Sequence, residues 1–247
     1  PEAGAFSLPV ASNALGERWL PRVADLPAAL QEMAYHSVNR LIDYQDEAYA
    51  EEWLSRVSAL IARDLDRESF SLAHEAGRHL ALWMAFEDIP RVAQLKVRPD
   101  RESMIRSEVK AAAGQPVKVA EFFHPRIEEV AALLPVGWGS GLLRSQTAKR
   151  WLSRLLGPRT LRTDRVSMQV LLRGLASVRR FRRSTFGYAH ERKMIDRWFD
   201  AVLSAGDHDM AMAIAALGGM VKGYGETRHR TTSRLMQILD YVEQSPD

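Results

Sequence analysis

Apolar residues recur every three to five positions through most of this chain, and this spacing constrains its fold more than any other feature. Side chains three or four residues apart lie on one face of an α-helix, so such a run predicts a helix with one buried side. The clearest stripes are Leu26, Leu30, Met33, Val38, Leu41 and Ile42, then Tyr49, Trp53, Val57, Leu60 and Ile61, then Phe70, Ala73, Ala76, Leu80, Trp83 and Met84.

The pattern predicts an all-α, irregular multi-helix domain of about nine helices, with at most one short extended segment, at Val117–Phe123. Residues 26–61 are expected to form one long helix or two with a kink near residues 44–46, and Asp25 with Pro27 is typical of a helix start. The glycine-rich residues 137–141 are expected to form a loop between helices. We expect residues 25–247 to form one helical accessory domain and residues 1–24, rich in proline and glycine, to form a linker or arm from an upstream domain.

Cysteine is absent from all 247 residues, which limits the chemistry of the chain. Without a thiolate, the chain has no cysteine nucleophile and cannot ligate an iron–sulfur cluster through cysteine. The absence is compatible with a cytoplasmic protein. No apolar run approaches the roughly 20 residues that a membrane-spanning helix needs, so we expect no membrane contact.

Two histidines on one predicted helix resemble a zinc-binding signature but have the wrong spacing. His74 and His79 are five residues apart, about 140° around a helix, whereas a shared metal ion needs a spacing of four. The seven histidines are otherwise scattered, and no nucleophile–base pair can be assembled. The sequence therefore predicts neither a metal site nor catalytic residues.

Positive charge is concentrated in residues 138–190, which hold 12 basic side chains against one acid, Asp164. The block either faces the acidic residues 25–90 or forms a solvated face, or it is a surface for nucleic acid, an acidic protein or a phosphorylated ligand. A second candidate is the glycine-rich stretch before the last helix, which is either an anion site at a helix start or a tight turn over a packed tyrosine. The candidate contact residues are Arg179, Arg180, Arg182 and Arg183 in the basic block, and Lys222, Gly223, Tyr224 and Gly225 in the glycine-rich stretch.

Four stretches, in order along the chain, resemble the C-terminal helical region of the indolepyruvate oxidoreductase β-subunit and of the fused indolepyruvate ferredoxin oxidoreductases. They are RLIDYQDEAYA (Arg40–Ala50), MAFEDIPRVAQL (Met84–Leu95), RFRRSTFGYAHERK (Arg180–Lys193) and VKGYGE (Val221–Glu226). The third stretch is shorter than in the family and lacks its acid, and Glu226 replaces the family's histidine in the fourth.

The resemblance implies an accessory or assembly domain of a thiamine-diphosphate-dependent aryl 2-oxoacid:ferredoxin oxidoreductase, without an active centre of its own. It implies that thiamine diphosphate and the iron–sulfur clusters are bound elsewhere in the parent enzyme. The expected partners are an upstream γ-type oxidoreductase domain, the thiamine-binding subunit and ferredoxin. The alternative is a basic helical module that binds nucleic acid or has a regulatory role. The arginines permit this function, although no recognition-helix motif is present.

Overall fold

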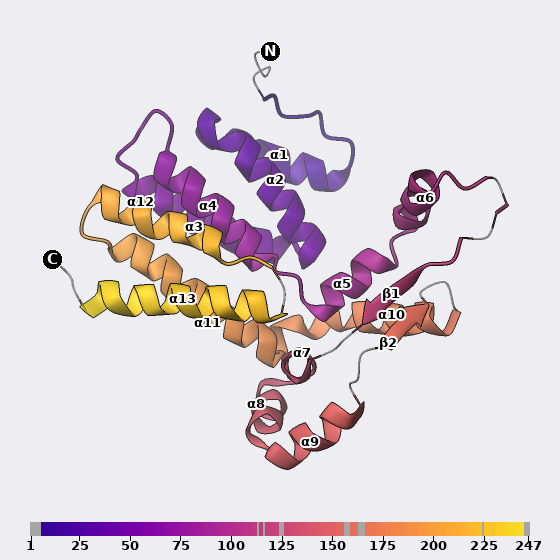
Figure 1. Ribbon diagram of the computed structural model, residues 1–247. Coiled ribbons are helices and arrows are strands. Elements are labelled where there is room, and N and C mark those ends of the chain that lie inside the picture. Colours follow the sequence, from indigo (N-terminus) through magenta and orange to yellow (C-terminus); the bar gives the residue numbers. More distant parts are fainter. Residues whose placement is uncertain are drawn as a thin grey trace. The chain divides into compact units, whose positions relative to one another are not determined.

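The protein, described by a computed structural model, divides into two compact units instead of the single domain expected over residues 25–247. Unit 1 comprises Pro1–Phe86 and Arg192–Asp247, and unit 2 comprises Glu87–Glu191. The structure describes residues 6–112, 114–115, 117–123, 126–155, 159–162, 166–223 and 225–244 (Figure 1).

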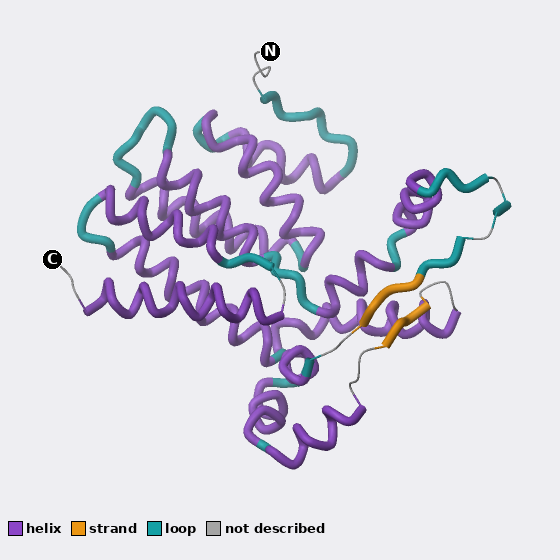
Figure 2. The backbone as a smooth tube through the Cα atoms, in the orientation of Figure 1, coloured by secondary structure: helices purple, strands orange, loops and turns teal. Residues whose placement is uncertain are grey.

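The prediction of an all-α fold is confirmed, but the number of elements was underestimated. The described residues form thirteen α-helices, where about nine were expected, because residues expected as linker (14–24) and as loop (137–141) also lie in helices. They also form two short strands where at most one was expected. Strand β1 (Ala120–Phe123) pairs antiparallel with β2 (Arg159–Arg162), with Ala120 opposite Arg162 (Figure 2). An isolated extended segment leaves its backbone groups unpaired, so β1 requires such a partner.

Unit 1 is a group of packed helices that contains most of the buried apolar side chains. Helices α2, α3 and α4 contact one another, and α12 contacts α4 (Figure 1). Its elements are α1 (Ala14–Ala24), α2 (Ala28–Tyr44), α3 (Glu47–Arg63), α4 (Ser71–Met84), α12 (His208–Leu217), the 3₁₀ helix η2 (Gly218–Met220), α13 (Gly225–Gln244) and the part of α11 (Phe186–Ser204) from Arg192 onward.

The expected linker over residues 1–24 is in part a helix. Helix α1 begins after Asn13, whose side chain accepts a hydrogen bond from the Gly16 amide at 2.8 Å. Trp19 is buried and donates its indole N–H to Glu47 at 2.9 Å. Asp25 therefore lies at the C-terminal end of α1 and does not cap the start of α2. Because residues 1–24 are rich in glycine and proline, the helical spacing of the few apolar residues in α1 was overlooked.

Large aromatic side chains form the core of unit 1, and two of its buried indoles donate to backbone carbonyls. The indole N–H of Trp53 donates to the Gly77 carbonyl at 3.0 Å, and that of Trp198 donates to the Ile214 carbonyl at 2.9 Å. Both indoles have no exposed surface. Buried tryptophans combine a large apolar area with one donor that must find an acceptor, so these contacts also determine how the helices align.

Unit 2 consists of shorter elements with little buried apolar surface. Helix α10 packs along α5, while α7, α8 and α9 contact one another. Its elements are α5 (Ile89–Lys96), α6 (Pro99–Glu108), α7 (Ile127–Leu133), α8 (Val136–Arg144), α9 (Gln146–Leu155), α10 (Val166–Ser177), the 3₁₀ helix η1 (Val178–Ser184), the two strands and the first residues of α11.

Residues 137–141 were expected to be a loop, but they lie inside helix α8. A Cβ atom at Gly139 would lie 2.6 Å from both the Ala131 carbonyl oxygen and the Phe186 Cβ atom. Glycine is therefore required there by close packing of α8 against α7 and the start of α11. Local propensity disfavours glycine in a helix, but this tertiary contact outweighs it.

Two glycine substitutions in α8 are expected to have opposite effects. Gly139→Ala places a methyl group against backbone and should lower the free energy of unfolding by about 1–3 kcal/mol. Gly137→Ala meets open space and should raise it by about 0.5–1 kcal/mol, because alanine favours the helix. Chemical denaturation of the two variants measures the difference. Equal stability of both variants would contradict the packing described for Gly139.

Candidate functional site

The four arginines predicted as one contact surface all lie in η1, but they do not share one role. Arg182 is 1% exposed and forms a two-point ion pair with Asp88, with Nε–Oδ2 at 2.6 Å and Nη2–Oδ1 at 3.0 Å. Asp88 also accepts a hydrogen bond from the Arg91 amide at the start of α5. Arg182 therefore joins η1 to α5 inside unit 2, and its prediction as a contact for an external partner is wrong.

The neighbouring arginines remain candidates for surface contacts. Arg180 and Arg183 are exposed and Arg179 is partly exposed. Phe181, which follows Arg180, is also exposed. In a tight helical turn consecutive side chains point in different directions, so one of four arginines can turn inward while its neighbours turn outward. A count of basic residues could not reveal this division.

The glycine-rich stretch before α13 forms a turn. Lys222 is exposed. Gly223 and Gly225 have backbone φ angles of 82° and 53°, which residues other than glycine rarely adopt. Helix α13 begins at Gly225. Tyr224 lies outside the described residues, so its predicted packing is not tested, and the anion site at Lys222 stays a prediction.

The preceding glycines are explained by packing in unit 1. A Cβ atom at Gly218 would lie 2.7 Å from the Trp198 ring and 2.8 Å from the His79 Cβ atom. A Cβ atom at Gly219 would lie 2.8 Å from Cε1 of His79. Helix α4 and η2 therefore approach each other through glycine, with the imidazole of His79 between them.

His79 is the buried member of a polar cluster on α4 that the sequence alone did not indicate. Its Nε2 lies 2.8 Å from Oε1 of Glu75, and the guanidinium of Arg78 lies 3.1 Å from both Nε2 of His79 and Oε2 of Glu75. In the neutral tautomer that suits this arrangement, Nε2–H donates to Glu75. His79 and Glu75 are four apart, a helical spacing that permits such a contact. His74 is not part of this cluster.

Protonation of His79 is expected to make stability depend on pH. Burial lowers the pKa of His79 below 6.5, the Glu75 hydrogen bond opposes this shift, and the Arg78 charge reinforces it. Because the unfolded state binds the proton more tightly, stability is full above about pH 6.5 and is lost as pH falls through the folded pKa. Thermal unfolding from pH 5 to 8 should show this decline in the native protein. His79→Gln should flatten it, whereas His229→Gln, at an exposed position, should not.

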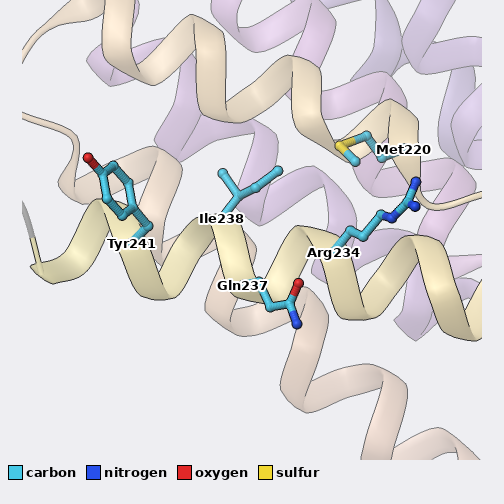
Figure 3. Close-up of a pocket in the computed structure, with 5 residues that line it drawn as sticks. All are labelled: Met220, Arg234, Gln237, Ile238 and Tyr241. Atoms are coloured by element: carbon cyan, nitrogen blue, oxygen red, sulfur yellow. The ribbon is translucent and has the colours of Figure 1, made fainter.

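One shallow groove of about 450 Å³ lies along α13 in unit 1. Figure 3 shows the side chain of Arg234, on α13, directed toward that of Met220, in η2. Ile238 and Tyr241 lie farther along α13, and Gln237 points to another side of that helix. The lining is mostly apolar with one cation, Arg234. Nothing in the sequence had singled these residues out.

A more extensive feature is the apolar surface that unit 2 leaves uncovered. Among the residues of unit 2 whose side chains the structure describes, the buried apolar ones are Pro90, Ala93, Ala131 and Leu172, whereas unit 1 buries all four of its tryptophans. Two tryptophans of unit 2 lie at the surface: Trp138 on α8 is 74% exposed and Trp151 on α9 is 64% exposed. The other large apolar side chains exposed in unit 2 are Met104, Val109, Val136, Val166, Val170, Leu171 and Phe181.

Basic residues surround the exposed tryptophans in the sequence of α8 and α9. Arg144, Arg150 and Arg154 are exposed, and Lys149 is partly exposed. Residues 136–155 contain these four cations and no acidic residue. Exposed aromatic side chains within a cationic surface are characteristic of contact sites for acidic macromolecules.

Neither a metal centre nor a membrane-spanning helix is found among the described residues. Within them, no three His, Asp or Glu side chains come together as a metal ion would require. In the same part of the chain, no helix combines the length and apolar character needed to cross a membrane. The exposed surface of α8 and α9 is therefore the principal candidate functional site.

Comparison with known proteins identifies the family of the chain. No curated protein and no solved structure matches it. A family model described as a family of unknown function, DUF6537, matches residues 30–241, which include most of both units. The chain therefore belongs to the DUF6537 family.

Proposed function

We propose that the chain is a non-catalytic assembly domain of a cytoplasmic, thiamine-diphosphate-dependent oxidoreductase that acts on indolepyruvate or a related aryl 2-oxoacid and passes electrons to ferredoxin. The enzyme class comes from the four stretches that resemble the C-terminal region of indolepyruvate oxidoreductases. The assembly role comes from the uncovered apolar surface of unit 2, and this is the observation on which the proposal depends.

The stretches that resemble the family contain contacts between segments distant in sequence, which supports an architectural role. Tyr49, in the first stretch, donates its hydroxyl to the Met84 carbonyl in the second at 3.0 Å. Asp88, in the second, pairs with Arg182 in the third. Both contacts are largely buried, and each connects segments far apart in sequence. Residues that make such contacts maintain the fold and need no role in a reaction.

The surface of unit 2 supports a role in assembly. A stable compact unit normally buries large side chains, because burial contributes about 25 cal/mol per Å² of apolar area. Unit 2 instead exposes two tryptophans and several aliphatic side chains. A partner that covered them would supply the missing burial. The upstream γ-type domain and the thiamine-binding subunit are the proposed partners.

The residues of this chain do not fit the cofactors of such an enzyme. An iron–sulfur cluster needs thiolate ligands, and the chain has no cysteine. Among the described residues, no three His, Asp or Glu side chains gather as a metal site would require. The glycines at 218–219 cannot cradle a phosphate, because His79 occupies the space beside them. We propose that both cofactors are bound in other parts of the parent enzyme.

Reconstitution tests this function. The isolated chain, supplied with indolepyruvate, coenzyme A, thiamine diphosphate, Mg²⁺ and methyl viologen, should show no dye reduction. The thiamine-binding subunit encoded by the same organism should bind the chain and show more stable arylpyruvate-dependent activity in its presence. Turnover by the chain alone, or a thiamine-binding subunit that neither binds the chain nor gains stability from it, would contradict the proposal.

A second candidate function is the binding of single-stranded nucleic acid. The exposed Trp138 and Trp151 among arginines favour it, since bases stack on aromatic rings and phosphates attract cations. Binding of this kind should weaken steeply with salt. A gel-shift assay with oligothymidylate in dilute buffer tests it, and the absence of retardation would exclude it.

A further inference from the structure

Helix α9 has an apolar face that unit 2 covers only in part. Ala148, Trp151 and Leu152 are three and four residues apart and so lie on one side of this helix. Trp151 is 64% exposed, while Ala148 and Leu152 are partly exposed. Contacts with α7 and α8 therefore leave the largest side chain of this face in solvent.

Helix α8 exposes its tryptophan between two glycines. Gly137 and Gly141 flank Trp138, and a Cβ atom at either glycine would meet nothing within 4 Å. Glycine at open helical positions lowers stability relative to alanine, so packing within the chain does not explain these residues. They leave the backbone beside Trp138 bare, which allows another surface to approach the indole closely.

The charge of this region determines which kind of occupant it suits. Residues 136–155 contain four cations and no anion, so a symmetric contact with a second copy of α8 and α9 would bring like charges together. An acidic surface would instead be attracted. Arg144, Arg150 and Arg154 are exposed and available for this attraction.

The apolar side chains favour a protein over a nucleic acid. Val136 on α8 is exposed, and Leu152 on α9 is partly exposed. Aliphatic side chains add nothing to base stacking or phosphate binding, but they contribute to the centre of a protein interface. Tryptophan and arginine are also the residue types that most often dominate protein–protein binding energy.

We infer that α8 and α9 form a docking surface for the acidic, apolar-centred face of a partner protein. Trp138 and Trp151 act as its apolar anchors, and Arg144, Arg150 and Arg154 steer the partner. The inference rests on the proposed function in one respect: the partner protein used to test it is the thiamine-binding subunit. The inferred principal contact surface is therefore formed by α8 and α9, and not by the η1 arginines.

Binding of the whole chain to the thiamine-binding subunit, measured by sedimentation at two salt concentrations, tests the inference. The double variant Trp138→Ala/Trp151→Ala should weaken association about hundredfold or more, because both anchors are lost. The triple variant Arg144→Glu/Arg150→Glu/Arg154→Glu should weaken it about tenfold or more at low salt and reduce its salt dependence. Two exposed positions of unit 1 serve as controls: Leu65→Ala and Arg230→Glu should change the affinity less than twofold.

The alternative outcomes separate this inference from the proposed function. If the complex forms and neither set of variants weakens it, the docking surface is wrong, while the assembly function stands. If the unaltered chain does not bind and the enzyme is equally stable without it, the assembly function is wrong as well. If a 20-residue oligothymidylate binds more tightly than the subunit and loses affinity in the double variant, the surface recognises nucleic acid and the inference is overturned.

Discussion

Replacing Arg182 by alanine is expected to destabilise unit 2 by about 3–5 kcal/mol, because the substitution leaves the carboxylate of Asp88 without its buried partner. The same side chain joins η1 to α5, so the contact between these elements should loosen. Hydrogen exchange of the α5 amides should accelerate, and chemical denaturation should show the loss of stability.

Arg180→Ala is the matched control, since Arg180 lies two residues earlier in η1 and is exposed. Its effect should stay within about 0.5 kcal/mol, as for most surface substitutions. Asp88→Asn should also destabilise, because it removes the charge that Arg182 faces. Arg182→Ala as stable as Arg180→Ala would show that the ion pair does not hold unit 2 together.

Replacing Trp198 by alanine is expected to destabilise unit 1 by about 3–5 kcal/mol. The substitution empties a fully buried site, removes the ring contact with Trp83 at 5.8 Å between centroids, and leaves the Ile214 carbonyl without its donor. Trp198→Phe should have a smaller effect, since it keeps most of the apolar area and loses only the hydrogen bond. Urea denaturation followed by circular dichroism measures both.

Trp151→Ala is the matched control for this prediction. The substitution is chemically the same, but Trp151 is largely exposed, so its removal leaves no cavity. The stability of this variant should remain within about 0.5 kcal/mol of the unaltered protein. A large destabilisation by Trp151→Ala would show that the exposed indole supports the fold, which would weaken its assignment to a docking surface.

The apolar spacing of the sequence predicted the class of fold and most helix positions. Of the two arrangements expected for residues 26–61, the one with two helices divided near residues 44–46 is found: α2 ends at Tyr44, and Asp46 caps α3 by accepting a hydrogen bond from the Tyr49 amide. Such features are local, because they depend on helical periodicity and on a side chain that reaches an amide three residues away.

The errors arose where contacts between distant residues outweighed local preference. Residues 137–141 look like a loop because of their glycines, but Gly139 is a helical residue whose missing side chain admits Phe186. Strand β1 was anticipated, whereas its partner β2 was missed because pairing between strands some 40 residues apart leaves no periodic signal in four residues. Proline and glycine likewise concealed α1.

The candidate site shows the same contrast between what local sequence predicts and what tertiary contacts decide. The sequence by itself determined the chemistry that the chain can offer: helices, no thiol, and a concentrated block of positive charge. Only the tertiary structure decided how each charge is used, since Arg182 looks like its neighbours in the sequence but is buried and pairs with Asp88 inside the fold. It also decided which tryptophans are exposed, because burial depends on what packs over a helix face, and a periodic pattern does not specify that.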